Sequence, residues 1–385
     1  MDLPALRRSL LALLGKGAAA RLDPEQWQML DRLAALHRLQ PLLHAERGND
    51  EAIPNAIRDG WRAAHRLSAM QALATRATLE ECCACLEQEG YEPIALKGSW
   101  LTRYAYPEPA QRPMRDVDIW VSAECVLSAY DVLLGGGYVA AEPPEMSLED
   151  TLRLEKHMPV LMSPRGVLVE LHHHLWEPAG RLDHASPGAD EAAIRARAAV
   201  DADGIRMLAP QDTLAHLVVH AVYSHRLDCG PLLLSDIDFL LRTATIDWPG
   251  FWAEAQAGHW QAGARLVLEL VQEWRGCAGI EFAGDPTPAD LLETAPDLLL
   301  QELDTRKSAQ LAAATLKGGA GQLAQRALGR RSATGEAEVT RDMSREGGAL
   351  GWAVSRAWRS ASQLARSDVR RQSRQLAALS KWLDQ

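Results

Sequence analysis

Apolar side chains recur every three or four positions through the first 90 residues, the spacing of amphipathic helices. Trp27, Leu30 and Leu33 follow this spacing, and a run rich in alanine and arginine continues it to about residue 89. Asp23-Pro24 offers a capping acid followed by a proline suited to a first helical turn. We therefore expect a helical lead-in over residues 1–90.

The pattern changes to short alternating runs between residues 91 and 205. In the run 116–121, Val117, Ile119 and Val121 alternate with two aspartates, as in a strand with one apolar face. Two further apolar runs, 157–162 and 167–173, flank a short Ser-Pro-Arg-Gly turn and predict a hairpin. Residues 91–205 should therefore form a mixed α+β core.

Helical spacing returns in residues 206–325, which we interpret as a helical domain. A polar stretch at 330–348 interrupts it, and a long amphipathic pattern then runs from 354 to 383. We assign residues 326–385 to a polar linker and a basic amphipathic C-terminal helix. From residue 322 onward, twelve basic residues face six acids, although the whole chain carries −10.

Net charge and composition narrow the functional classes. The 385 residues include 47% apolar residues, enough for sizeable cores, and the negative charge argues against broad nucleic-acid binding.

We expect the basic helix to dock on the acidic body; an acidic partner, RNA or a membrane surface remain alternatives. Without a signal-peptide pattern or a membrane-spanning apolar run, we expect a cytoplasmic protein, and its six cysteines should be reduced structural thiols.

Candidate chemistry begins at Asp116 and Asp118. On a strand their side chains share one face, about 7 Å apart at the Cα atoms. Hard oxygen ligands on a rigid strand suit Mg²⁺, while phosphates and water fill the remaining positions. The other Asp-Xaa-Asp pairs are not on a predicted strand. Asp201 and Asp203 lie in a predicted turn, and the side chains at positions 236 and 238 diverge on a predicted helix.

Upstream, Lys97-Gly98-Ser99 follows a short apolar run and precedes a helical pattern. A strand, a turn of small residues and a helix form a phosphate-binding layout. Ser99 is expected to contact phosphate; the alternative is that it only caps the following helix.

Glu170 lies in the middle of the second hairpin strand, where an unpaired buried charge would be costly. It needs a partner, and a metal ion would be one. His172 shares its face, while His173 alternates away, so the histidine run is not a cluster. His216 and His220 have helical metal-pair spacing, but a core or interface role is favoured.

Together these motifs resemble the DNA polymerase β-like nucleotidyltransferase superfamily, and more closely its bacterial nucleotidyltransferase family proteins. The resemblance covers about residues 30–245 and rests on Leu96-Lys97-Gly98, Tyr106-Pro107, Arg112, Asp116-Val117-Asp118-Ile119-Trp120-Val121 and Val169-Glu170-Leu171-His172. It implies a polymerase β-like core, a mixed sheet with helices on one face, embedded in mostly helical N- and C-terminal regions.

The resemblance also implies an activity: transfer of a nucleoside monophosphate from a triphosphate, with ATP the first choice, to an acceptor hydroxyl. Asp116, Asp118 and Glu170 would hold Mg²⁺ or Mn²⁺, and Glu170 could accept the hydroxyl proton. Lys97, Arg112 and Arg115 are candidate phosphate contacts beside Gly98 and Ser99. A catalytically silent interaction module and a metal-dependent phosphohydrolase are the alternatives, and the acceptor could be a small molecule, a peptide or protein side chain, or an RNA end.

Overall fold

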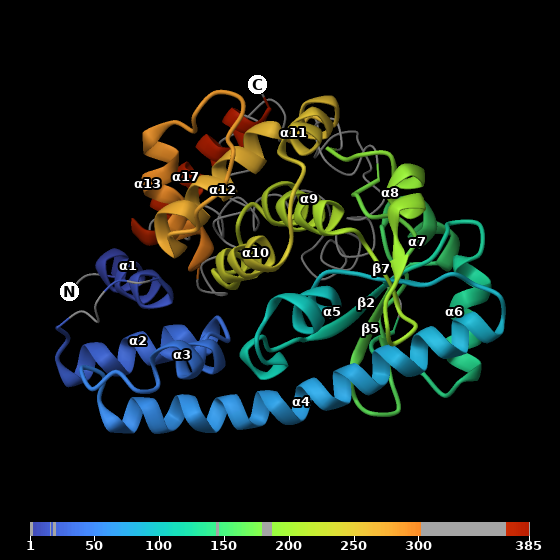
Figure 1. The fold of residues 1–385 in the computed structure, drawn as a ribbon, viewed down its shortest axis with the longest axis horizontal. Helices are drawn as coiled ribbons and strands as arrows, with labels where there is room; N and C mark the ends of the chain where they lie inside the picture. Colours follow the sequence, from blue (N-terminus) through green and yellow to red (C-terminus); the bar gives the residue numbers. More distant parts are fainter. Residues whose placement is uncertain are drawn as a thin grey trace, which may run out of the picture. The chain divides into compact units, whose positions relative to one another are not determined.

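The computed structural model describes residues 3–15, 17, 21–143, 146–178, 187–301 and 367–384 (Figure 1). The α-helices are α1 (Leu3–Leu14), α2 (Pro24–Leu36), α3 (Gln40–Arg47), α4 (Asn55–Gln88), α5 (Gly98–Trp100), α6 (Val126–Gly135), α7 (Leu148–Leu154), α8 (Glu191–Arg197), α9 (Pro210–Val219), α10 (Leu232–Thr243), α11 (Trp248–Ala257), α12 (Gln261–Arg275), α13 (Ala289–Leu299) and α17 (Ser367–Leu383). The π-helical segments are η1 (Leu101–Ala105) and η3 (His220–Ser224), and the 3-10 turn is η2 (Pro109–Gln111). The strands are β1 (Ile94–Ala95), β2 (Asp116–Trp120), β3 (Val139–Ala140), β4 (Leu161–Met162), β5 (Leu168–His172), β6 (Ala199–Val200) and β7 (Arg206–Met207).

The strands form one mixed sheet in the order β3-β4-β5-β2-β1-β7-β6. β2 pairs in parallel with β5 and antiparallel with β1, and β4 pairs antiparallel with β5. The expected hairpin is confirmed at β4 and β5. A mixed sheet surrounded by helices also confirms the α+β class, and it is consistent with a nucleotidyltransferase-like core.

One face of the two central strands is apolar and fully covered. Val117 and Ile119 of β2, and Val169 and Leu171 of β5, are completely buried. α4 packs against β2, α6 packs against β5, and the two helices also contact each other. The alternation that buries these four side chains turns the intervening polar residues toward the opposite face.

The helices that follow the sheet pack close to the turn after β1. α10 packs against η1, and α12 packs against α10 and α9. On the N-terminal side, α3 packs against both α4 and η2. α3 and α10, which are far apart in the sequence, thus both contact the segment between β1 and β2.

Contacts divide the chain into two compact units, Met1–His225 with Cys229–Thr287, and Arg226–Asp228 with Pro288–Gln385. In the second unit, α17 buries Val369, Leu376 and Leu379 and packs against α13. The described part of the predicted C-terminal helix is thus amphipathic; residues 354–366 and the polar stretch 330–348 lie outside the described residues. The four-part domain division stays a prediction.

Within the described residues, no helix is both long enough and apolar enough to cross a bilayer. All six cysteines are free thiols, as the sequence interpretation requires. Burial raises the pKa of Cys82 to about 12, which keeps that thiol protonated and unreactive near neutral pH.

Candidate functional site

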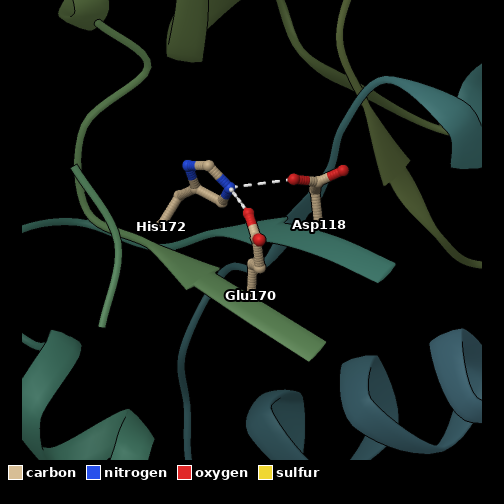
Figure 2. Close-up of side chains that lie close together, drawn as sticks. All are labelled: Asp118, Glu170 and His172. Carbon is tan, nitrogen blue, oxygen red and sulfur yellow. Dashed lines mark hydrogen bonds and ion pairs between the residues drawn. The ribbon is translucent and has the colours of Figure 1, made fainter. Parts of the chain in front are cut away.

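The polar face of β2 and β5 carries a cluster of two carboxylates and one imidazole. Asp118 lies directly opposite Glu170 in the parallel register, and His172 follows two residues after Glu170 on the same face. His172 Nε2 lies 2.9 Å from Asp118 Oδ1 and 3.4 Å from Glu170 Oε2. Figure 2 shows all three side chains projecting from one side of the strands, with helices on the other side.

Lys97 supplies the positive charge of this cluster. Its Nζ lies 2.6 Å from Asp118 Oδ1, in an ion pair whose side chains are 12% and 5% exposed. Burial alone would raise the pKa of Asp118, but Lys97 and the hydrogen bond from His172 outweigh it and hold that pKa well below its usual range. Asp118 is therefore a buried, ionised carboxylate with two partners.

The backbone at Lys97 is held in an uncommon conformation. Its φ of 43° and ψ of −112° lie in a region that residues with a side chain rarely adopt. Such conformations persist only where the surrounding structure enforces them, and they are concentrated at functional sites. Here the conformation directs a lysine from the turn after β1 to a carboxylate on β2.

Asp116 and Glu170 differ from Asp118 in their charge balance. Burial, followed by the charges of Asp118 and Glu170, raises the pKa of Asp116 to about 6. Burial also favours the neutral form of Glu170, but its interaction with His172 lowers its pKa below the usual value. Asp116 is close enough to sense both carboxylates, although it is not one of the three residues whose ligand atoms converge.

The turn after β1 is shaped by close contacts at Gly98 and Ser99. A Cβ at Gly98 would overlap Nη1 of Arg112 and lie 3.1 Å from Cε of Met114. The Ser99 amide donates to Leu96 O at 3.1 Å, and the buried Ser99 Oγ has no hydrogen-bond partner among the described residues. α5 begins at Gly98, with Lys97 in the capping position. The alternative that Ser99 caps this helix is therefore wrong.

Arg112 is fixed by a partner far along the chain. Its Nε and Nη2 donate to the two oxygens of Asp236 on α10, at 2.7 and 2.9 Å, and Tyr106 Oη donates to the same carboxylate at 2.8 Å.

Asp238 instead pairs with Arg242 and Arg275. The two aspartates of α10 diverge, as helical spacing predicts. Arg115, the other predicted phosphate contact, is exposed.

His173, His174 and His216 do not join the cluster. His173 Nε2 lies 3.1 Å from Leu152 O, and His174 Nδ1 lies 3.1 Å from Glu191. His216 is fully buried, and neither of its ring nitrogens has a hydrogen-bond partner among the described residues. Its burial agrees with the core role predicted from sequence.

Asp118, Glu170 and His172 are suitable ligands for a divalent cation. One ligand atom from each lies within 4.8 Å of the other two, and the described residues contain no other such group of three. Carboxylate oxygens suit Mg²⁺ and Mn²⁺, and the imidazole adds a nitrogen donor. The sequence placed Asp118 and Glu170 in this group; His172 was singled out only by its shared face.

Comparison with known proteins identifies the family to which this geometry belongs. Residues 23–276 match the family model described as uncharacterised nucleotidyltransferase. No curated protein matches the chain. The family match spans well over half of the sequence and includes every residue of the cluster, the turn and the Arg112–Asp236 pair. The chain therefore belongs to the uncharacterised nucleotidyltransferase family and is a nucleotidyltransferase.

Proposed function

We propose that this enzyme transfers a nucleoside monophosphate from a nucleoside triphosphate, ATP being the first to test, to a hydroxyl group of an acceptor. The observation that carries the proposal is the convergence of Asp118, Glu170 and His172 beside the turn at Lys97 and Gly98, in a chain of this family. A cluster that can bind a cation, next to a turn that carries cationic side chains, suits a triphosphate bound together with a metal ion.

Asp118 and Glu170, with His172 and the neighbouring Asp116, would hold Mg²⁺ or Mn²⁺. When bound, such a cation offsets the charge that develops around the α-phosphate and lowers the pKa of the attacking hydroxyl. Lys97 neutralises Asp118 in the structure described above. We assign it a second role, contact with the phosphate oxygens, which it could take up if a cation neutralised the carboxylates.

The chain's own residues account for the remaining steps. The acceptor oxygen attacks the α-phosphorus, its proton passes to a carboxylate oxygen of Glu170, and the bond to the bridging oxygen breaks as pyrophosphate leaves. Gly98 allows Arg112 to approach the turn, and Ser99 offers a hydroxyl that has no hydrogen-bond partner in the part of the chain that the structure describes. Arg112 and Arg115 complete the predicted phosphate contacts.

Isotope transfer tests the proposal directly. The purified chain is incubated with Mg²⁺ or Mn²⁺, a lysate, and ATP, CTP, GTP or UTP labelled at the α-phosphate. Label bound to an acceptor supports transfer, free labelled nucleotide without a labelled acceptor indicates a phosphohydrolase, and neither product indicates an interaction module. Fractionating the lysate by size before the reaction assigns the acceptor to small molecules, proteins or RNA.

The matched variants are Glu170→Gln and Asp59→Asn. The first keeps the shape of a site carboxylate but removes its charge, so labelling should fall by a factor of about a hundred or more. The second removes an exposed carboxylate, 65% accessible, on α4 and should label as the wild type does. Equal labelling by both variants would contradict the assignment of Glu170. A cytoplasmic location stays a prediction.

A further inference from the structure

Arg38 occupies a backbone position that usually belongs to glycine. α2 ends with the Arg38 amide donating to Ala35 O and the Leu39 amide donating to Ala34 O, the two crossed hydrogen bonds of a Schellman motif. The residue at this position adopts a left-handed conformation, and Arg38 has φ 56°. A side chain is disfavoured here, so an arginine at this position suggests a role beyond ending the helix.

The guanidinium of Arg38 has no ion pair with a carboxylate among the described residues. The residue is half-buried, and its buried Nε has no hydrogen-bond partner among the described residues. Burial, followed by the charges of Arg115 and Arg112, lowers the pKa of Arg38 to about 10, while Asp116 and Asp236 act in the opposite direction. A partly desolvated guanidinium without a partner is costly unless a ligand completes its hydrogen bonds.

Packing explains why these charges meet. α3, which begins two residues after Arg38, packs against η2, the turn that directly precedes Arg112. Asp236 already accepts two hydrogen bonds from Arg112 and one from Tyr106. The charges of Arg112 and Arg115 thus act on Arg38 beside Asp116, and among the described residues Arg112 is the one of these three arginines that has an ion pair with a carboxylate.

We propose that Arg38 forms, together with Arg112 and Arg115, a cradle for the β- and γ-phosphates of the triphosphate and for the pyrophosphate that leaves. Guanidinium groups bind phosphate oxygens through paired, charge-assisted hydrogen bonds, which a polyphosphate supplies in number. The inference rests on the proposed function for its ligand, and it assigns part of the substrate site to the N-terminal helical region.

Calorimetry of three variants tests the cradle, with pyrophosphate, ATP and AMP as probes in the presence of Mg²⁺. Arg38→Met removes the charge and keeps much of the length, Arg38→Gly also relieves the left-handed backbone, and Arg32→Met removes an exposed arginine of α2 as a control. We expect Arg38→Met and Arg38→Gly to weaken pyrophosphate and ATP binding by roughly tenfold to a hundredfold and to leave AMP binding unchanged. Arg32→Met should bind all three probes as the wild type does.

Melting temperature separates binding from a structural role. Arg38→Gly should melt at or above the wild-type temperature, because glycine suits the left-handed position. Unchanged pyrophosphate affinity in a folded Arg38→Met chain would overturn the cradle, as would a wild type that binds neither pyrophosphate nor ATP. Arg38-dependent pyrophosphate binding without label transfer would instead leave the cradle standing and count against the proposed transfer reaction.

Discussion

Asp116 and Asp118 share one face of β2, two residues apart, yet the pKa values of their carboxyl groups are shifted in opposite directions. The pKa of Asp116 is raised to about 6, and that of Asp118 is held well below its usual range. The difference follows from their partners, because Lys97 and His172 contact Asp118 directly. We therefore expect these two residues, which look equivalent in the sequence, to have opposite effects on stability.

Neutralising the two aspartates should change stability in opposite directions. Asp118→Asn leaves Lys97 buried without its counter-ion, so the free energy of unfolding should fall by about 3 kcal/mol or more. Asp116→Asn removes a charge that burial and its neighbours disfavour, so at pH 8 the free energy of unfolding should rise by about 1–3 kcal/mol. Urea denaturation without nucleotide measures both. Both variants should lose transfer activity, and a shift of both stabilities in one direction would contradict this account.

The gain from Asp116→Asn should depend on pH. Because the folded pKa of Asp116 is raised, the unfolded chain ionises first, and stability is lost as pH rises from about 4 through about 6. The advantage of the asparagine should therefore be smaller at pH 5 than at pH 8. Repeating the denaturation at both pH values checks the sign; a larger gain at pH 5 would place Asp116 in a stabilising ion pair.

Lys97 should compete with a divalent cation for Asp118. Replacing it by methionine removes the nearest positive charge, so Mn²⁺ should bind about tenfold or more tightly in the absence of nucleotide. Lys97→Arg keeps the charge and serves as the matched control, with affinity close to wild type. Electron paramagnetic resonance of free Mn²⁺ measures both, and circular dichroism checks that each variant is folded. Weaker Mn²⁺ binding by Lys97→Met would show that Lys97 does not oppose the cation.

Local patterns predicted the carboxylates of the site but not their neutralisation. Alternation placed Asp118 and Glu170 on polar faces, since that period depends only on the strand itself. Lys97 was expected to contact phosphate oxygens, whereas the positive φ at this residue directs its ammonium group to Asp118. No local pattern marks such a backbone conformation in a lysine.

Long-range pairing limited the prediction of the phosphate contacts. Arg112 was identified from its motif, but its two hydrogen bonds go to Asp236, 124 positions away, on a helix brought close by tertiary packing. Arg38 gave no signal at all, because it follows a helix in a region interpreted only by its apolar spacing. Its significance depends on which charges surround it, and tertiary structure alone brings these together.

Ser99 has separate consequences for stability and for nucleotide binding. No described residue hydrogen-bonds its buried Oγ, so Ser99→Ala should leave the free energy of unfolding unchanged or raise it by about 1 kcal/mol. If the hydroxyl contacts phosphate, the apparent KM for the triphosphate should rise about tenfold. Thr102→Val is the control, because it removes a nearby hydroxyl that already has a protein partner: Thr102 Oγ1 donates to Gly98 O at 2.9 Å. Unchanged KM in Ser99→Ala would remove Ser99 from the phosphate site.

His216 should make the fold sensitive to mild acid. Burial, followed by the charges of Lys97 and His172, holds the pKa of His216 well below its usual value, so the folded chain keeps this ring neutral. The unfolded chain protonates it near pH 6.5, and the associated stability is therefore present above that pH and lost below it. One such histidine accounts for about 1.4 kcal/mol between pH 7.5 and pH 5.5.

His216→Phe keeps an aromatic ring against Trp176, whose centroid lies 5.8 Å from the imidazole, and removes the titrating group. The loss of unfolding free energy between pH 7.5 and pH 5.5 should therefore shrink by about 1.4 kcal/mol relative to wild type. His174→Gln provides the opposite case, because the hydrogen bond to Glu191 raises the pKa of His174, so acidification favours folding there. That variant should lose stability at pH 5.5 at least as steeply as wild type. Identical pH profiles for wild type and His216→Phe would mean that His216 takes up its proton at the same pH in the folded and the unfolded chain. Its burial, without a hydrogen-bond partner for either ring nitrogen among the described residues, argues against this outcome.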